Sequence, residues 1–319
     1  MATTDQIINM VKAYSANDDD RFRTVVLQIA AHEAKLGHGN IAQELKKEAD
    51  NLEKKRTVLK MTSTMGAMLE YTTPSVKLID LIAGETVIKK IKRILLEYQN
   101  KKKLHNSGLN NRRKILLEGN PGTGKTMTAA IIASELGLPL FTVQVDKLVT
   151  KFMGETSIRL RQIFENMAFN NGVYLFDEFD AIGADRAMDN EVGEMRRILN
   201  AFLQFIEMDV SESIIIAATN NQKILDKALF RRFDDVIHYD LPDDEQIQRL
   251  YEHKLNGFAE KNVYGSDVIR ASRGLSHAEL SMICDDVLKD SILFNKTISK
   301  DSIITLVKER QYVYQRMEA

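Results

Sequence analysis

Eight consecutive residues have the types and order needed to hold a triphosphate: Gly119, Asn120, Pro121, Gly122, Thr123, Gly124, Lys125 and Thr126. They follow the apolar stretch Ile115–Leu117 and match G-x-x-x-x-G-K-[ST] at every fixed position. Glycines permit the tight turn that directs backbone N–H groups at phosphate oxygens. Lys125 would reach the β- and γ-phosphates, Thr126 would bind Mg²⁺, and the helix from about Met127 would add its positive end. The pattern predicts a phosphate-binding loop between a strand and a helix.

Two carboxylates, Asp177 and Glu178, follow a second apolar stretch, Val173–Phe176. If that stretch is a strand of a parallel sheet, its carboxyl end lies beside the phosphate-binding loop. Asp177 would then hold Mg²⁺ through water, and Glu178 would orient and deprotonate the attacking water. An acidic pair can also cap a helix, but its place downstream of the loop favours the catalytic interpretation. The glutamate also favours hydrolysis over nucleotide binding alone.

Short apolar segments that alternate with helical stretches must position these residues. Strands are predicted near 114–118, 140–145, 173–177, 214–219 and 236–239. The pattern is typical of a parallel sheet with helices on both faces, so the expected fold class is α/β, a P-loop NTPase αβα sheet. Four regions are expected along the chain: an all-helical N-terminal domain, 1–58; a linker, 59–75; the ATPase core, 76–241; and a C-terminal helical lid, 242–319. The linker assignment rests on its Thr, Gly and Pro content and its lack of a clean period.

Composition narrows the function classes. Apolar residues make up 44% of the 319 residues, which is enough for a sizeable core. The formal net charge of −1 disfavours a nucleic-acid-coating protein. One cysteine excludes a disulfide within the chain and fits a reducing compartment. The absence of a long apolar run or a secretory signal leads us to expect a cytoplasmic protein with no membrane partner.

Three further segments, in chain order, resemble motifs of the AAA ATPases. Residues 148–156 resemble the first pore loop, and Ala217–Asn220 resembles the sensor-1 motif. Residues 225–234 resemble the family's LD-x-A-L…R…R-F-D segment, without the Pro-Gly between the arginines, as in katanin and spastin relatives. The resemblance covers about residues 76–319.

The resemblance implies roles for particular side chains. Phe152 and Met153 would line the channel of a hexameric ring and grip a polypeptide; the alternative is a buried pair at a helix start. Asn220 would help to position the attacking water. Arg231 and Arg232 would be arginine fingers that reach the neighbouring subunit's ATP, the alternative being a surface salt-bridge pair.

Two segments resemble those that flank the nucleotide in the family. Asp80–Gly84 resembles the adenine-pocket segment, so Ile82, Ala83 and Gly84 are expected to contact the nucleotide. Residues 274–280 resemble the start of the lid helix, which places Gly274 and His277 near the nucleotide, although the family usually has Gly at 277. Ser276 and Glu279 also form a capping box without any catalytic role. Arg196 and Arg197 would contact another subunit or form a solvated helix face.

The N-terminal stretch Asp19–Glu33 resembles bacterial AAA ATPases encoded beside subtilisin-like serine proteases. That resemblance implies a substrate- or partner-selecting domain and a protease partner. His32, Glu33 and His38 do not form a zinc-protease motif, because H-E-x-x-H needs histidines four residues apart on one helix face.

The function expected from sequence is therefore an ATP-hydrolysing AAA mechanoenzyme that uses ATP and Mg²⁺. It would assemble into a ring that unfolds, translocates or remodels proteins, with a separately encoded protease as a candidate partner. The alternative is a nucleic-acid remodelling motor or clamp-loader-like ATPase, which the neutral charge and the aromatic pore loop disfavour. The intact set of catalytic residue types disfavours a non-catalytic scaffold.

Overall fold

The computed structural model describes residues 4–15, 19–47, 49, 66, 68–148, 155–179, 191–220 and 230–318. The chain divides into two compact units, Met1–Gly66 and Ala67–Ala319. Each unit is described by itself below.

The N-terminal unit contains α1 (Thr4–Ser15), α2 (Asp19–Lys35) and a helical segment at 39–47. The break after α2 falls at Gly37, whose φ of 86° is in the left-handed region that favours glycine. The Nδ1 of His38 lies 2.6 Å from a Glu33 carboxylate oxygen, so these side chains form a local pair. No cluster of three metal-ligating side chains occurs among the described residues.

The larger unit is built on a six-stranded sheet with the order β1-β3-β4-β5-β2-β6. Its strands are β1 (Leu69–Thr72), β2 (Lys114–Gly119), β3 (Leu140–Val143), β4 (Val173–Phe176), β5 (Ile214–Thr219) and β6 (Asp235–Tyr239). All pairings are parallel except that of β1 with β3. The α/β fold class is confirmed, and the five predicted strands are present with ends shifted by at most two residues.

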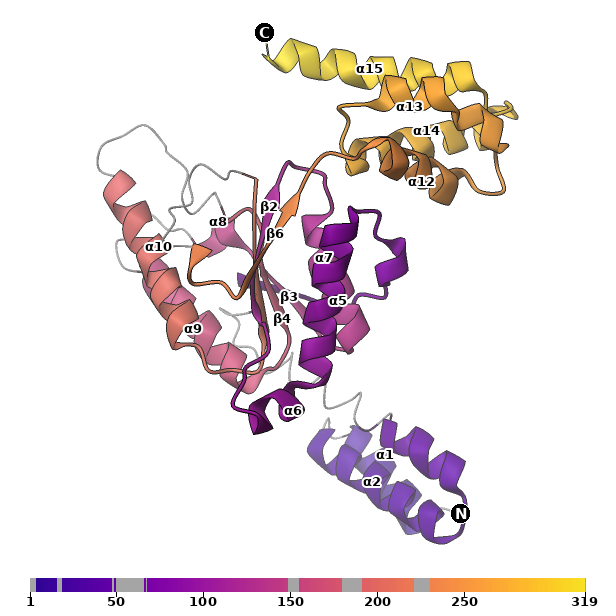
Figure 1. The fold of residues 1–319 in the computed structure, drawn as a ribbon. Coiled ribbons are helices and arrows are strands. Elements are labelled where there is room, and N and C mark those ends of the chain that lie inside the picture. The colour runs from indigo at the N-terminus through magenta and orange to yellow at the C-terminus, as the bar shows by residue number, and fades with distance from the viewer. Residues whose placement is uncertain are drawn as a thin grey trace. The chain divides into compact units, whose positions relative to one another are not determined.

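Helices cover both faces of this sheet (Figure 1). One face packs against α5 (Glu85–Gln99) and α7 (Lys125–Leu136), which share a continuous apolar core with alternate strand residues. The other face packs against α9 (Glu155–Phe169) and α10 (Glu191–Met208) through stacked and edge-on rings of Phe164, Phe176 and Phe202. Two short helices, α6 (Lys101–Asn106) and α8 (Val145–Leu148), complete the core, with the 3₁₀ turn η1 (Leu78–Asp80) before α5.

The interpretation of residues 69–72 as linker was wrong, because they form β1. Leu69 pairs with Val143 and Thr72 with Leu140 in antiparallel register. The strand is anchored by burial of Met68 and Leu69 and by the Tyr71 ring, which lies 5.6 Å from that of Phe141. Four residues with one buried strand position carry too weak a period to be recognised from sequence.

The C-terminal part of the larger unit is helical, as expected. It contains α12 (Asp244–Leu255), the 3₁₀ turn η4 (Lys261–Tyr264), α13 (Ser266–Ser272), α14 (His277–Phe294) and α15 (Lys300–Glu318). These elements enclose their own apolar core, which includes Tyr251, Leu280 and Cys284. Burial raises the pKa of the Cys284 thiol to about 12, which keeps it protonated and unreactive.

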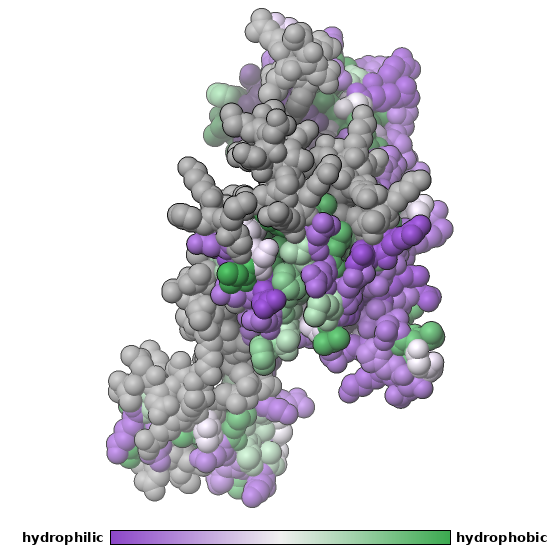
Figure 2. Space-filling model, turned by 90° about the vertical axis from the view of Figure 1, so that its left-hand side faces the viewer, coloured by the Kyte–Doolittle hydropathy of each residue, from purple (hydrophilic) through white to green (hydrophobic). Residues whose placement is uncertain are grey.

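Among the described residues, no helix is long and apolar enough to cross a membrane. The side of the larger unit that carries α9 and α10 shows hydrophobic residues interspersed with hydrophilic ones (Figure 2). Four large apolar side chains on these helices or just after them are exposed: Ile158, Phe169, Met208 and Val210.

Candidate active site

The phosphate-binding loop predicted from sequence connects β2 to α7 with three glycines in the left-handed region. The φ angles are 141° at Gly119, 73° at Gly122 and 103° at Gly124. A Cβ at Gly119 would lie 2.1 Å from the Tyr239 carbonyl oxygen, and one at Gly122 would lie 2.6 Å from the Ser276 hydroxyl. Glycine is therefore required at these positions by both backbone conformation and space.

The loop surrounds the Lys125 ammonium. Its Nζ donates to the carbonyl oxygens of Gly119 and Asn120, each at 2.8 Å, and the side chain is buried. The Thr123 hydroxyl donates to the Asn120 carbonyl at 2.7 Å. The exposed residues Asn120, Pro121 and Gly122 form the outer edge of the loop, while Met127 begins to pack into the core behind it.

The Thr126 hydroxyl and the Asp177 carboxylate meet at 2.7 Å, although 51 positions separate them. They are brought together because α7 begins, and β4 ends, at the carboxyl edge of the sheet. A threonine hydroxyl beside a carboxylate is the oxygen donor set that Mg²⁺ prefers. The two side chains therefore fit a divalent cation held between protein and phosphate oxygens.

Glu178 adopts a backbone conformation that is rare for residues other than glycine, with φ of 49°. Its N–H donates to the Asp177 carboxylate at 3.0 Å, and the next residue, Phe179, is buried against the Phe202 ring at 4.5 Å. Burial of Phe179 and the preceding strand thus constrain the turn from both sides. The turn leaves the Glu178 side chain exposed beside Asp177, where a general base for water would be needed.

Asn220 immediately follows β5, which lies between β4 and β2. In the parallel register Thr219 is opposite Glu118, and Ala217 is opposite Phe176. Asn220 is therefore at the same edge as Gly119 and Asp177, as its sensor interpretation requires.

The lid helix α14 docks directly on the phosphate-binding loop. The Ala278 N–H donates to the Gly122 carbonyl oxygen at 2.9 Å. Ser276 caps the helix, and the Glu279 side chain accepts from the Ser276 N–H at 2.5 Å, so the predicted capping box is present. Gly274, with φ of 87°, permits the turn that leads into this cap. A movement of α14 would therefore act on the loop itself.

Residues 81–84 connect the two cores of this unit. Leu81 and Ala83 are buried in the sheet core, whereas Ile82 packs against the lid core. Gly84 is the N-cap residue of α5, and a Cβ there would lie 3.8 Å from the Gln246 side-chain nitrogen of α12. Ile82, Ala83 and Gly84 thus lie where the sheet core and the lid meet, next to the loop, because a Cβ at Gly124 would lie 3.4 Å from Leu81.

His277 belongs to a polar group that the sequence did not predict. Its Nε2 lies 3.3 Å from the Gln246 side-chain oxygen, and the Gln246 side-chain nitrogen donates to Asp243 at 2.9 Å. Burial lowers the pKa of His277, opposed by Asp243. Its Nδ1 is buried, and no residue in the described ranges forms a hydrogen bond with it. A polar pair between α12 and the start of α14 could have been found only from the docking of these helices.

Arg231 and Arg232 lie away from the other candidates. They precede β6, whose first residue is opposite Ile115 and whose last is opposite Gly119. The two arginines are therefore at the amino edge of the sheet, and the phosphate-binding loop of the same chain is at the carboxyl edge. The length of β2 separates them, about 17 Å at roughly 3.3 Å per residue.

Some predicted residues lie outside the described part of the chain. These are Phe152 and Met153 of the pore-loop segment. The backbone of Arg196 and Arg197 lies within α10, but their side chains are also outside it. Their roles remain predictions.

The strand, the glycine-rich loop, the helix and the acidic strand end define a P-loop nucleoside triphosphatase. Residues 115–241 match the family model described as ATPase family associated with various cellular activities (AAA). The chain is 31% identical over 305 residues to an uncharacterised AAA family ATPase of Sinorhizobium fredii, covering 92% of this chain and 90% of that protein. The chain belongs to the AAA family, and it is an ATPase.

Other similar proteins share only part of their length with this chain. A putative 26S proteasome regulatory subunit homologue of Methanothermobacter thermautotrophicus is 33% identical across 60% of this chain and 51% of its own. The ATP-dependent zinc metalloprotease FtsH of Borreliella burgdorferi is 33% identical across 64% of this chain and 34% of its own. The crystal structure of the FIGL-1 AAA domain matches with a TM-score of 0.62 and 19% identity, covering 79% of this chain and 88% of that one.

The loop geometry predicts a large effect of Gly119→Ala. The added methyl group would meet the Tyr239 backbone and would also sit at a left-handed φ, so we expect a loss of roughly 3 kcal/mol or more in unfolding free energy. Chemical denaturation measures it. Gly137→Ala is the matched control, because Gly137 has φ of 64° but nothing near its Cβ position; it should cost only about 1 kcal/mol. Equal losses for the two variants would contradict the steric argument.

Proposed function

We propose that this ATPase works as a ring that uses ATP hydrolysis to unfold, translocate or remodel proteins. The observation that carries the catalytic part is the contact of the Thr126 hydroxyl with the Asp177 carboxylate at 2.7 Å, beside Glu178. It brings a phosphate-binding loop, a cation ligand pair and a base candidate to one edge of the sheet.

Each residue has a distinct role in this proposal. Lys125 and the loop N–H groups bind the phosphates, and Thr126 and Asp177 hold Mg²⁺. The cation, when bound, neutralises charge on the phosphate oxygens. Glu178 takes the proton of the attacking water, and Asn220 orients that water. Ile82, Ala83, Gly84, Gly274 and His277 enclose the nucleotide between the sheet and the lid.

The position of the arginines supports a site shared between subunits. Arg231 and Arg232 lie at the sheet edge opposite their own phosphate-binding loop, which favours a role at the nucleotide of another copy over one at their own. An arginine supplied in trans stabilises charge that develops in the transition state. Exposed apolar side chains such as Phe169 and Val210 favour association of subunits. A hexamer is the ring size that the family resemblance implies.

Protein substrates are favoured over nucleic acid. Two matched proteins are named as a putative 26S proteasome regulatory subunit homologue and as an ATP-dependent zinc metalloprotease, and the net charge of this chain is −1. The pore-loop residues Phe152 and Met153 would grip an extended polypeptide through apolar contact. We therefore include a separately encoded protease as a partner in the proposal, with the N-terminal helices selecting the substrate.

Stimulation of ATP hydrolysis by its substrate tests this proposal. An unfolded polypeptide is expected to raise the steady-state ATPase rate several-fold, because gripping in the pore is coupled to turnover; single-stranded DNA is not. Phe152→Ala should lose the stimulation. Phe258→Ala is the matched control, since that ring is 59% exposed just after α12 and outside the pore-loop segment. Stimulation by DNA but not by protein would instead support the nucleic-acid motor.

A further inference from the structure

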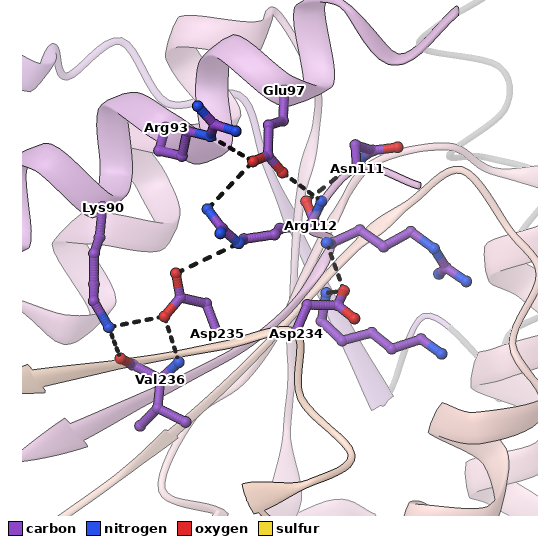
Figure 3. Close-up of polar contacts among 10 residues, drawn as sticks. Lys90, Arg93, Glu97, Asn111, Arg112, Asp234, Asp235 and Val236 are labelled. Atoms are coloured by element: carbon purple, nitrogen blue, oxygen red, sulfur yellow. Dashed lines mark hydrogen bonds and ion pairs between the residues drawn. The ribbon is translucent and has the colours of Figure 1, made fainter. Parts of the chain in front are cut away.

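The turn that carries the two arginines is fastened to the start of β2 through Asp234. The Asp234 N–H donates to the Lys114 carbonyl oxygen at 2.7 Å. One Asp234 carboxylate oxygen accepts from the backbone N–H groups of both Arg113 and Lys114, each at 2.9 Å. Figure 3 shows the Asp234 side chain directed at these two nitrogens. Three hydrogen bonds, two of them to a charged acceptor, thus hold a single residue three positions after Arg231.

The next residue extends the anchorage to α5. Asp235 pairs with Lys90 at 2.8 Å and lies 3.8 Å from Arg112. Arg112 in turn contacts Glu97, which also accepts from Arg93 (Figure 3). The contacts to Arg112 and Arg93 hold the pKa of Glu97 below its usual range against the opposing effect of burial. The segment after the arginines is therefore tied both to the central strand and to a helix behind it.

The two arginines differ in their own contacts. Arg232 forms an ion pair with Glu207, near the end of α10. Asp209, two residues later, pairs with Arg113 at the start of β2, so the end of α10 is joined to the same edge. Arg231 is exposed, and the described part of the chain offers it no ion pair. One arginine is thus held by its own subunit, whereas the other points into solvent.

We propose that Asp234 and Glu207 are positioning residues for the arginine finger: Asp234 fixes the turn to β2, Glu207 retains Arg232, and Arg231 is the arginine offered to the neighbouring subunit. The inference rests on the proposed function, because it presupposes that the finger acts in trans. As a consequence, a substitution at Asp234 lowers ATP hydrolysis at the neighbouring subunit's site and not at the site of the subunit that carries the substitution.

Mixed assemblies separate the two subunits' contributions. Lys125→Ala subunits cannot use their own site but can offer Arg231; Arg231→Ala subunits have an intact site but offer no finger. Each alone should be inactive, and the mixture should recover ATPase activity. Asp234→Ala is then added to one partner at a time, with co-assembly followed by analytical ultracentrifugation.

Asp234→Ala in the Lys125→Ala partner should lower the recovered rate at least tenfold, since a displacement of about 1 Å can cost ~10²-fold. The same change in the Arg231→Ala partner should alter the rate less than twofold. Asp234→Asn retains a neutral hydrogen-bond acceptor, so in the Lys125→Ala partner it should give a smaller loss of the recovered rate than Asp234→Ala. It replaces the alanine variant in this test if that variant fails to fold.

The outcomes distinguish this inference from the proposed function. If the two parent variants do not recover activity when mixed, the trans-acting finger itself is refuted. If they recover activity but Asp234→Ala acts equally in both arms, or mainly in the Arg231→Ala partner, Asp234 supports its own subunit's β2 and the positioning role is wrong. A loss that merely follows a loss of co-assembly also counts against it.

Discussion

Arg231→Ala is expected to lower kcat for ATP by about 10³-fold or more, while ATP binding changes little, because the arginine acts on charge that develops in the transition state. Its exposed guanidinium lies at the sheet edge opposite its own phosphate-binding loop, so we expect the loss to arise in the neighbouring subunit. Steady-state kinetics of the assembled protein, with a fluorescent nucleotide for binding, measure the two quantities separately.

Arg232→Ala is the matched control for that variant. Its guanidinium is paired with Glu207, so we expect a loss of less than about tenfold, through looser positioning of the turn. The two substitutions remove the same charge from adjacent positions. Equal losses in kcat would show that the ion pair with Glu207 does not keep Arg232 from acting on the neighbour's nucleotide. A larger loss for Arg232→Ala would make Arg232, and not Arg231, the arginine finger.

Glu178→Gln is expected to bind ATP but to lower its turnover about 10²–10⁴-fold, the range that a positioned general base contributes. Glutamine keeps the size of the side chain at this left-handed position but cannot accept the proton of the attacking water. Single-turnover hydrolysis of prebound ATP isolates the chemical step. Because ATP remains bound, this variant should also hold the assembly together and trap a substrate in a pull-down.

Glu165→Gln controls for the loss of a negative charge on the same domain. Glu165 is exposed on α9, away from the carboxyl edge of the sheet. The kcat of the Glu165→Gln variant should therefore stay within about twofold of the parent value. Normal hydrolysis by Glu178→Gln would remove Glu178 as the base and would leave the contact between Thr126 and Asp177 without a catalytic partner.

The phosphate-binding loop could be predicted from sequence because its requirements are local. A left-handed φ at Gly119, Gly122 and Gly124 needs glycine whatever surrounds them. The five strands could likewise be predicted from their apolar segments, since buried parallel strands contain nearly continuous hydrophobic runs. The β1 strand was missed because its residues are defined by pairing with β3, not by their own pattern.

The contacts between the lid helices and the phosphate-binding loop were less predictable from the sequence. His277 is near Gln246 and Asp243 only because α14 docks beside α12. The Gly122 carbonyl is bound by Ala278 for the same reason. Neither pairing leaves a periodic or spaced pattern in the sequence, since the partners lie far apart along the chain.

Residue types and their spacing along the chain were sufficient to identify the class of protein and the side chains available for binding and hydrolysing a nucleoside triphosphate. Motif order and local backbone chemistry were sufficient for that. The different contacts of Arg231 and Arg232 could be found only in the folded chain, because they depend on the ion pair between Arg232 and Glu207. Charge pairs and hydrogen bonds between distant segments depend on how the segments pack, and packing is a property of the whole fold.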